Sequence, residues 1–181
     1  MGTGRRSGRT ALMTTAMVAC ALLGAGRARA ASNDGWETLN LPAKAFKLTD
    51  LEGRVLDSAS LKGKIVIIDF WATWCTPCVQ ELPELEAYKK KLAGRKDVVL
   101  LSLNVTEEAK QVRDFAKSRA MLPPIYLGDD LLGPYNVVGF PTKLILDLRG
   151  GAPGKLRSRR EGGPVPLSSL EAQVQAVLAA P

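Results

Sequence analysis

The stretch KIVIIDFWATWCTPC, from Lys64 to Cys78, indicates the fold class and the chemistry of this chain. Its first half is a nearly continuous apolar run rich in β-branched residues, which is typical of a strand buried on both faces of a sheet. The second half of the stretch ends in a C-x-x-C at the expected start of a helix. The free backbone N–H groups there carry partial positive charge, which favours a thiolate. We therefore expect Cys75 to be the attacking thiolate. Cys78, one turn further along and on the buried side, is expected to be the resolving thiol of a mixed disulfide.

Three other uses of a C-x-x-C pair fit this chain less well. A zinc site needs four ligands, but the chain has no His and only one further Cys. A haem-attachment motif requires His directly after the second cysteine, where Val79 stands. A disulfide that closes so short a loop restricts the unfolded chain very little, so it would stabilise the fold only weakly. The sequence thus favours redox chemistry, with Thr76 and Pro77 restraining the first helical turn and tuning which redox form is favoured.

Residues 1–30 have the pattern of an export signal. Arg5, Arg6 and Arg9 precede an apolar stretch from about Ala11 to Gly24, and Ala28-Arg29-Ala30 ends in small residues suited to cleavage. Cleavage after this tripeptide is expected, which makes the protein periplasmic or otherwise extracytoplasmic. An uncleaved membrane anchor is the alternative, although the apolar run is shorter than the roughly 20 residues that span a bilayer.

The export signal also accounts for the basic composition. The chain has 25 Lys and Arg against 18 Asp and Glu, and residues 1–30 hold five of the basic residues and none of the acidic ones. The remainder carries a net charge of +2, which does not indicate nucleic-acid binding. Cys20 lies within the signal and is either removed with it or a site of lipid attachment. The cysteines of the mature chain are then those of the C-x-x-C alone, and none remains for a separate structural disulfide. This pattern is more typical of a redox catalyst than of a disulfide-stabilised scaffold.

The rest of the chain predicts a single domain that alternates strands and helices. Residues 31–44, rich in Ser, Asn, Asp, Gly and Pro, are expected to be a flexible tether, and residues 45–181 to be the domain. Strands are expected at 46–48, 55–56, 64–70, 97–103, 143–148 and 156–160, and helices at 75–92, 107–119 and 168–178. The first two strands form a hairpin, and Ser168 or Ser169 caps the last helix. A basic cluster is expected on a solvated strand edge; it comprises Lys155, Arg157, Arg159 and Arg160.

Two separated motifs resemble the thioredoxin superfamily. The first is DFWATWCTPC over residues 69–78, followed by Glu81 and Pro83, and the second is Gly139-Phe140-Pro141-Thr142 before a strand. The hairpin ahead of the first core strand, and the longer segment between residues 104 and 135, are similar to its exported TlpA/ResA-type thiol-disulfide reductases. The resemblance covers about residues 46–178. It implies an α/β thioredoxin-like fold: a central mixed sheet with helices on both faces, an extra N-terminal β-hairpin and a central insertion.

The resemblance implies an active-site groove beside the cysteines. Pro141 matches a proline that follows a cis peptide bond next to the sulfurs, and the backbone of Phe140 would pair with the substrate chain. Trp74 would shield the disulfide and offer a flat contact to the substrate. Thr76, Pro77 and Thr142 complete the set of residues expected at this groove.

Two acids are expected to support proton transfer. Asp69 matches a buried acid that shuttles the proton of the resolving cysteine in thioredoxin, whereas many members of the exported branch have a non-ionisable residue there. A strand-end acid in contact with water is the alternative for Asp69. Glu81 matches a Glu-x-Pro of the exported branch, and we expect either a second carboxylate near the sulfurs or a solvated helix acid.

The resemblance implies an exported oxidoreductase that reduces disulfides in client proteins, for example in cytochrome c maturation, and that needs no cofactor. A membrane thiol-disulfide electron donor would have to re-reduce it, because the compartment offers no general reducing pool. Two alternatives stay open: an oxidase that donates its disulfide to folding proteins, and a redox-silent chaperone that holds extended peptides at Phe140 and Pro141. No nucleic-acid or metal partner is expected.

Overall fold

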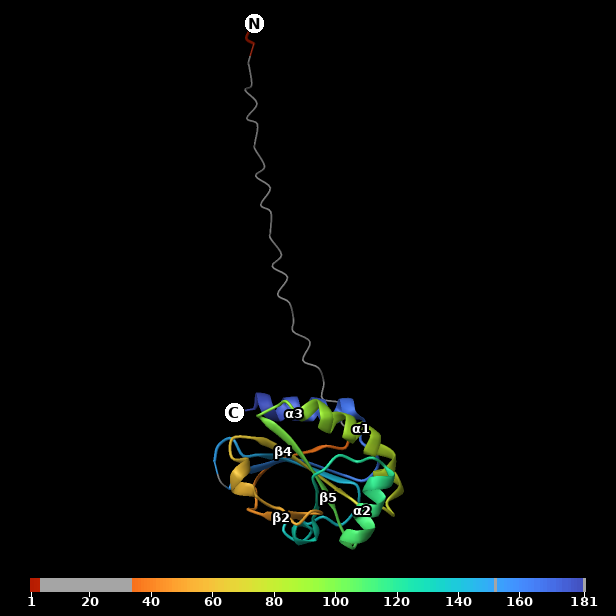
Figure 1. The fold of residues 1–181 in the computed structure, drawn as a ribbon. Coiled ribbons are helices and arrows are strands. Elements are labelled where there is room, and N and C mark those ends of the chain that lie inside the picture. The colour runs from red at the N-terminus through yellow and green to blue at the C-terminus, as the bar shows by residue number, and fades with distance from the viewer. Residues whose placement is uncertain (4–33, 152, 181) are drawn as a thin grey trace. The chain divides into compact units, whose positions relative to one another are not determined.

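Eight strands form one mixed sheet in the described part of the chain, in the order β1-β8-β7-β4-β5-β6-β2-β3 (Figure 1). The computed structural model describes residues 1–3, 34–151 and 153–180, so most of the expected export signal, Cys20 included, and the first residues of the expected tether lie outside the described residues. The strands are β1 (Glu37–Pro42), β2 (Lys47–Asp50), β3 (Val55–Asp57), β4 (Ile65–Trp71), β5 (Val98–Asn104), β6 (Ile125–Leu127), β7 (Thr142–Asp147) and β8 (Lys155–Glu161). The helices are α1 (Thr76–Leu92), α2 (Ala109–Ser118) and α3 (Leu167–Ala179), with the 3-10 helices η1 (Ser58–Leu61) and η2 (Asp129–Leu131).

The centre of the sheet consists of β7, β4 and β5. β4 runs parallel to β5 and antiparallel to β7, and all of its residues are buried. A strand covered on both faces needs apolar side chains at consecutive positions, which explains why its sequence is continuous rather than alternating. The predicted strand and its two-sided burial are thus confirmed.

One face of the sheet is covered by α1 and α3, which lie next to each other in Figure 1. Their buried apolar residues recur three and four positions apart, so that each helix presents one apolar side to the sheet. The core on this face includes Leu85, Tyr88 and Leu92 of α1, Leu170, Val174 and Val177 of α3, and Ile65, Ile67 and Ile145 of the sheet.

The other face is covered by the two 3-10 helices and by loops. Leu61 of η1 and Leu131 of η2 belong to one cluster with Phe70 and the other side chains on that side of β4. The helix α2 packs where β4 leads into the C-x-x-C, since Val112 shares a cluster with Trp71 and both cysteines. Together α2 and β6 are the insertion expected between residues 104 and 135.

The prediction of a flexible tether over residues 31–44 is wrong for residues 37–42. These residues form β1, which pairs antiparallel with β8. Just before it, the Trp36 Nε1 donates a hydrogen bond of 3.1 Å to Ser169 Oγ. The segment has the composition of a loop, but the free edge of β8 satisfies its backbone hydrogen bonds and so makes it a strand.

The basic cluster of residues 155–160 does not lie on a solvated edge, because β1 covers β8. Arg159 instead donates to the carbonyl oxygens of Tyr135 and Asn136, at 2.9 and 2.8 Å. Arg160 donates to the carbonyl oxygen of Gly162 at 2.8 Å. These side chains therefore hold loops in place.

Other predicted elements are mostly confirmed. β2 and β3 form the expected hairpin. β6 was not predicted, because it follows directly on Pro124 and has only three residues. The N-cap of α3 is Pro166 rather than Ser168 or Ser169.

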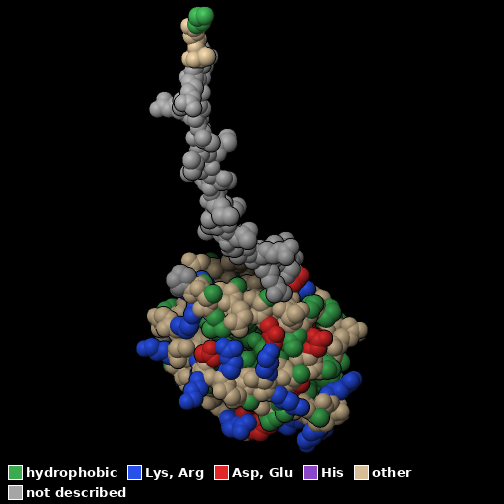
Figure 2. Space-filling model, turned by 90° about the horizontal axis from the view of Figure 1, so that it is seen from above, with side chains coloured by type: hydrophobic (Ala, Val, Ile, Leu, Met, Phe, Trp, Pro, Cys, Tyr) green, Lys and Arg blue, Asp and Glu red, His purple; other side chains and the backbone are tan. Residues whose placement is uncertain are grey.

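Within the described residues, no helix is long and apolar enough to cross a membrane. Acidic and basic side chains are interspersed on the face that Figure 2 shows.

Candidate active site

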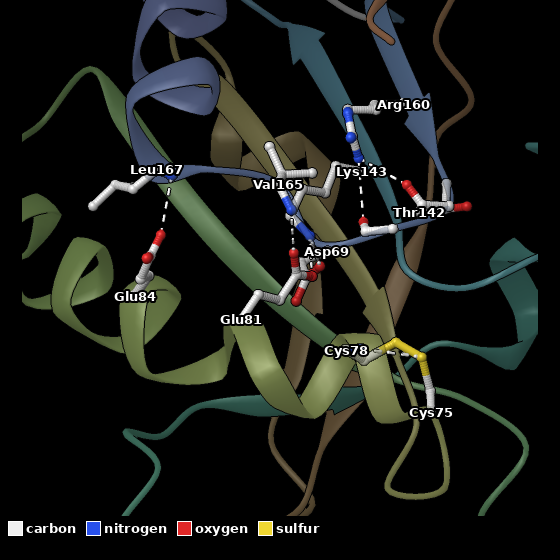
Figure 3. Close-up of polar contacts among 12 residues, drawn as sticks. Asp69, Cys75, Cys78, Glu81, Glu84, Thr142, Lys143, Arg160, Val165 and Leu167 are labelled. Carbon is white, nitrogen blue, oxygen red and sulfur yellow. Dashed lines mark hydrogen bonds and ion pairs between the residues drawn. A yellow bond between two sulfur atoms is a disulfide. The ribbon is translucent and has the colours of Figure 1, made fainter. Parts of the chain in front are cut away.

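The two cysteines lie where the loop after β4 enters α1 (Figure 3). Cys75 and Cys78 form a disulfide, with Cα atoms 5.2 Å apart. Cys75 is the N-cap residue of α1, and its sulfur accepts a hydrogen bond of 3.3 Å from the backbone N–H of Cys78. Cys78 is fully buried, whereas Cys75 is 4% exposed. The expected asymmetry is confirmed: the first sulfur faces the positive end of the helix and the second lies on its buried side.

An apolar surface flanks the disulfide. Phe140 packs against the cluster that contains both cysteines. Trp74 is 61% exposed and meets the Phe140 ring edge-on, with ring centroids 5.8 Å apart. The Phe140–Pro141 peptide bond is cis, as the resemblance implies, and Val138 beside this segment is also exposed. The chain thus offers exposed aromatic and aliphatic surface next to a sulfur that is almost covered.

The remaining groove residues differ in their exposure. Thr76 is exposed and Pro77 half-buried in the first turn of α1. Thr142 is fully buried, and its Oγ1 donates a hydrogen bond of 2.7 Å to the carbonyl oxygen of Gly139. Contrary to the expectation for a groove residue, the Thr142 side chain does not line the surface but orders the loop that carries Phe140 and Pro141.

A buried lysine joins the two acids that the sequence singled out. Lys143 Nζ forms ion pairs with Asp69 Oδ1, at 2.9 Å, and with Glu81 Oε1 (Figure 3). The other carboxylate oxygen of Glu81 accepts a hydrogen bond of 2.9 Å from the backbone N–H of Val165. All three charged side chains are at most 2% exposed. This cluster of Asp69, Glu81 and Lys143 is called the buried ion cluster below.

The charges in the buried ion cluster influence one another. Burial and the nearby charge of Asp69 raise the pKa of Glu81, although Lys143 acts against this rise. Burial alone would lower the pKa of Lys143, but the two carboxylates outweigh it and the net direction is upward. Because its pKa is raised, the Glu81 carboxyl can take up and release a proton. Lys143 stays charged while this happens, because its pKa is raised as well.

Both acids therefore lie in the interior, and neither is the solvent-exposed acid of the alternative interpretation. Sequence reasoning missed Lys143, which it included only as the first residue of a predicted strand. The sequence does contain a clue to its role, because a lysine inside an apolar strand is buried only if it has a charged partner. That partner follows from the topology: Asp69 of β4 and Lys143 of β7 are directly opposite each other in the antiparallel register.

A second polar network holds the loop in front of Cys75. The Glu107 carboxylate accepts hydrogen bonds from the backbone N–H of Thr73 at 2.6 Å and from the Thr73 hydroxyl. It also accepts from Asn104 Nδ2 at 2.8 Å and from Gln111 Nε2 at 2.7 Å. Glu107 thus ties the residue two positions before Cys75 to the start of α2. No motif around Glu107 indicates this role.

No cluster of three or more His, Cys, Asp or Glu side chains suited to a metal ion occurs in the described ranges.

A sequence model of the AhpC/TSA family matches residues 39–176 of the chain. The chain belongs to the AhpC/TSA family. The match spans most of the described domain, from β1 to α3, and it confirms the thioredoxin-like assignment.

Curated relatives are similar over part of their length. The thioredoxin-like protein YneN of Bacillus subtilis (strain 168) is 39% identical over 110 residues, which are 60% of this chain and 65% of YneN. The thiol-disulfide oxidoreductase ResA of Bacillus cereus (strain ZK) is 36% identical over 111 residues, 60% of this chain and 63% of ResA. The matched region is thus less than two thirds of either relative.

Solved structures show the same fold. The thiol:disulfide interchange protein of the thioredoxin family from Chlorobium tepidum TLS is 27% identical, with a TM-score of 0.67 over 79% of this chain and 99% of that protein. StoA from Bacillus subtilis is also 27% identical, with a TM-score of 0.60 over 71% of this chain and 95% of StoA. The expected thioredoxin-like fold is therefore confirmed.

Proposed function

We propose that the protein is an exported thiol-disulfide oxidoreductase that reduces disulfides in client proteins. The observation that carries this proposal is the Cys75–Cys78 disulfide at the start of α1, with Cys75 as N-cap beside the exposed Trp74. The name of ResA, a relative, describes the same class of chemistry.

The reaction proceeds from the reduced protein in two exchanges. The Cys75 thiolate attacks one sulfur of the client disulfide, which forms a mixed disulfide and releases the other client sulfur as a thiolate. Deprotonated Cys78 then attacks the Cys75 sulfur, which frees the second client thiolate and leaves Cys75 bonded to Cys78. Two electrons pass from the protein to the client, and a membrane thiol-disulfide donor returns them.

The site residues take the following parts. Trp74, Phe140 and Pro141 form the apolar surface against which an extended client segment lies, with Thr76 and Pro77 at its rim. Asp69 and Glu81 support proton transfer to and from Cys78. Glu81 lies three residues after Cys78 on α1, which places both on neighbouring turns of the same side of the helix.

Export is the second part of the proposal, and it rests on residues 1–30, with cleavage before the described domain. Cytochrome c maturation is a client task that fits this chemistry. Reduction is favoured over disulfide donation because the dipeptide between the cysteines is Thr76-Pro77 and contains no His.

The decisive test is the reduction potential of the Cys75/Cys78 pair, followed by Trp fluorescence in graded dithiothreitol or glutathione buffers. A potential near the roughly −270 mV of thioredoxin supports a reductase, whereas one near the roughly −120 mV of DsbA supports a disulfide donor. Reduction of insulin disulfides should be lost in Cys75→Ser. If client handling survives in the double variant Cys75→Ser/Cys78→Ser, the protein is a redox-silent binding module and the proposal fails.

A further inference from the structure

Four of the seven residues of β5 have a strand neighbour on one side only. β4 pairs with the whole of β5, from Val98 to Asn104. On the other side, β6 is in register with residues 102–104 alone. Among the described residues, Val98–Leu101 thus has no strand partner on the side away from β4.

The backbone of this edge points alternately towards β4 and away from it. The Asp97 carbonyl accepts from the Ile65 N–H, so Asp97 faces β4. The Asn104 carbonyl accepts from the Gly128 N–H, so Asn104 faces the β6 side. Because successive residues of a strand alternate, the N–H and C=O groups of Val98 and Leu100 face away from β4. Val98 and Leu100 are only 2% and 6% exposed, so a further strand can reach these groups only through the space directly beside the edge.

A groove of about 590 Å³ runs along this edge. Its walls come from α1, from the loop before β6 and from the region of β3 and η1, and they are mainly apolar. The apolar wall residues include Leu56, Leu61, Leu92, Leu122, Pro123 and Pro124. An extended segment lying here would place alternate side chains against these walls.

The charged side chains that line the groove are all basic: Lys64, Lys89, Lys90 and Arg95. Arg95 is neutralised by its ion pair with Asp97 at 2.5 Å. Lys64 and Lys89 donate their hydrogen bonds to backbone carbonyls rather than to carboxylates. Lys90 is exposed and forms no ion pair within the described part of the chain. The Glu86 carboxylate accepts a hydrogen bond from the Leu122 N–H and also acts on the charge of Lys89. The positive charge without an acidic partner at this groove is therefore that of Lys90.

We propose that this groove binds an extended, acidic segment of a partner protein, which adds to the sheet as a strand along Val98–Leu101. Backbone hydrogen bonds to Val98 and Leu100 hold the segment, the apolar walls accept its alternate side chains, and its carboxylates face the lysines. Val98 is opposite Ile65, at the other end of β4 from the cysteines. The groove is thus separate from the client surface at Trp74 and Phe140.

The test uses the oxidised, ¹⁵N-labelled protein and a blocked hexapeptide of alternating Glu and Val. We expect chemical-shift changes at the amides of Val98 and Leu100, slower hydrogen exchange there, and weakening by salt. Binding should weaken several-fold in Lys90→Glu but not in the matched control Lys117→Glu, an exposed lysine on α2. Binding should persist in Cys75→Ser/Cys78→Ser, so the result is independent of the redox proposal.

Two control peptides make the proposal refutable. A peptide with Lys in place of Glu should not bind, and one with N-methyl groups on alternate backbone nitrogens should bind much more weakly. Equal binding of either peptide overturns the proposal, as does the absence of any change at residues 98–101 with millimolar peptide. Changes confined to Trp74 and Phe140, or produced by anionic vesicles instead of the peptide, also overturn it.

Discussion

Replacing Lys143 by Met tests whether the buried ion cluster is a unit. Methionine keeps the length of an unbranched side chain but removes the ammonium that Asp69 and Glu81 share. The two carboxyl groups then stay in positions that are 1% and 2% exposed. The Val165 N–H still donates to Glu81, but both ion pairs are lost.

The expected loss of stability follows from this burial. Removing one partner of a buried ion pair typically costs about 3–5 kcal/mol. Two pairs are broken, but a carboxyl can escape the penalty by taking up a proton, so we expect about 4 kcal/mol at pH 7 rather than twice that.

The loss should depend on pH in a defined direction. Without Lys143, the pKa of Glu81 rises further, because burial and the charge of Asp69 raise it while the lysine opposes them. A carboxyl whose pKa is higher in the folded than in the unfolded state binds more protons when folded, so stability falls as pH rises above the unfolded value of about 4.3. One proton corresponds to about 1.4 kcal/mol per pH unit, so the variant should regain up to about 2.7 kcal/mol between pH 7 and pH 5.

Urea unfolding of the oxidised protein at pH 5, 6 and 7 measures both quantities. Lys117→Met, at an exposed position on α2, is the matched control and should change stability by less than about 0.5 kcal/mol. The triple variant Asp69→Asn/Glu81→Gln/Lys143→Met should lose the pH dependence, since no buried ionisable side chain of the cluster then remains without a partner. A loss below about 1 kcal/mol at pH 7, or the same loss at pH 5 and 7, would show that the three charged side chains do not act as a unit.

Three further outcomes are expected at other sites. Glu107→Gln replaces a carboxylate that accepts from Thr73 and should cost about 2 kcal/mol in urea unfolding, whereas Glu108→Gln, whose side chain makes no capping bond, should be neutral. Arg149→Met removes the donor to the last carbonyl groups of α3 and should cost about 1–2 kcal/mol, with faster hydrogen exchange at that helix end. The Arg149 hydrogen bond lowers the pKa of Asp147, so this pair stabilises the fold above the unfolded value of about 3.9, and its contribution is lost as pH falls below it. Asp147→Asn should therefore flatten the loss of stability in acid, measured by thermal unfolding between pH 2 and 5.

Elements with a local signature could be predicted from the sequence. β4 and β5 are continuous apolar runs because both faces of the sheet are covered, and α1 begins at a motif that marks a helix start. β1 and β6 have no such signature. Their strand conformation comes from pairing with β8 and with β5, which are distant in the sequence, so composition alone indicated a loop.

The same distinction applies to the site. Cys75, Cys78 and Pro141 lie in short motifs and were identified directly. Lys143 and Glu107 act on partners 74 and 34 residues away, which only the register of β4 with β7 and the position of α2 bring into contact. The sequence therefore indicates the cysteine pair but not the charged side chains that hold the elements around it.

Those charges fix the helix that carries the cysteine pair to several parts of the fold. Glu81 ties the second turn of α1 to β7 and to Val165, and Glu84 on the next turn accepts a hydrogen bond from the Leu167 N–H at the start of α3. Glu107 fixes the loop on the other side of Cys75. If the protein acts on clients as proposed, a site whose supporting residues are fixed in this way needs little rearrangement to bind them. The buried ion cluster therefore fixes α1 to β7 and to the segment before α3.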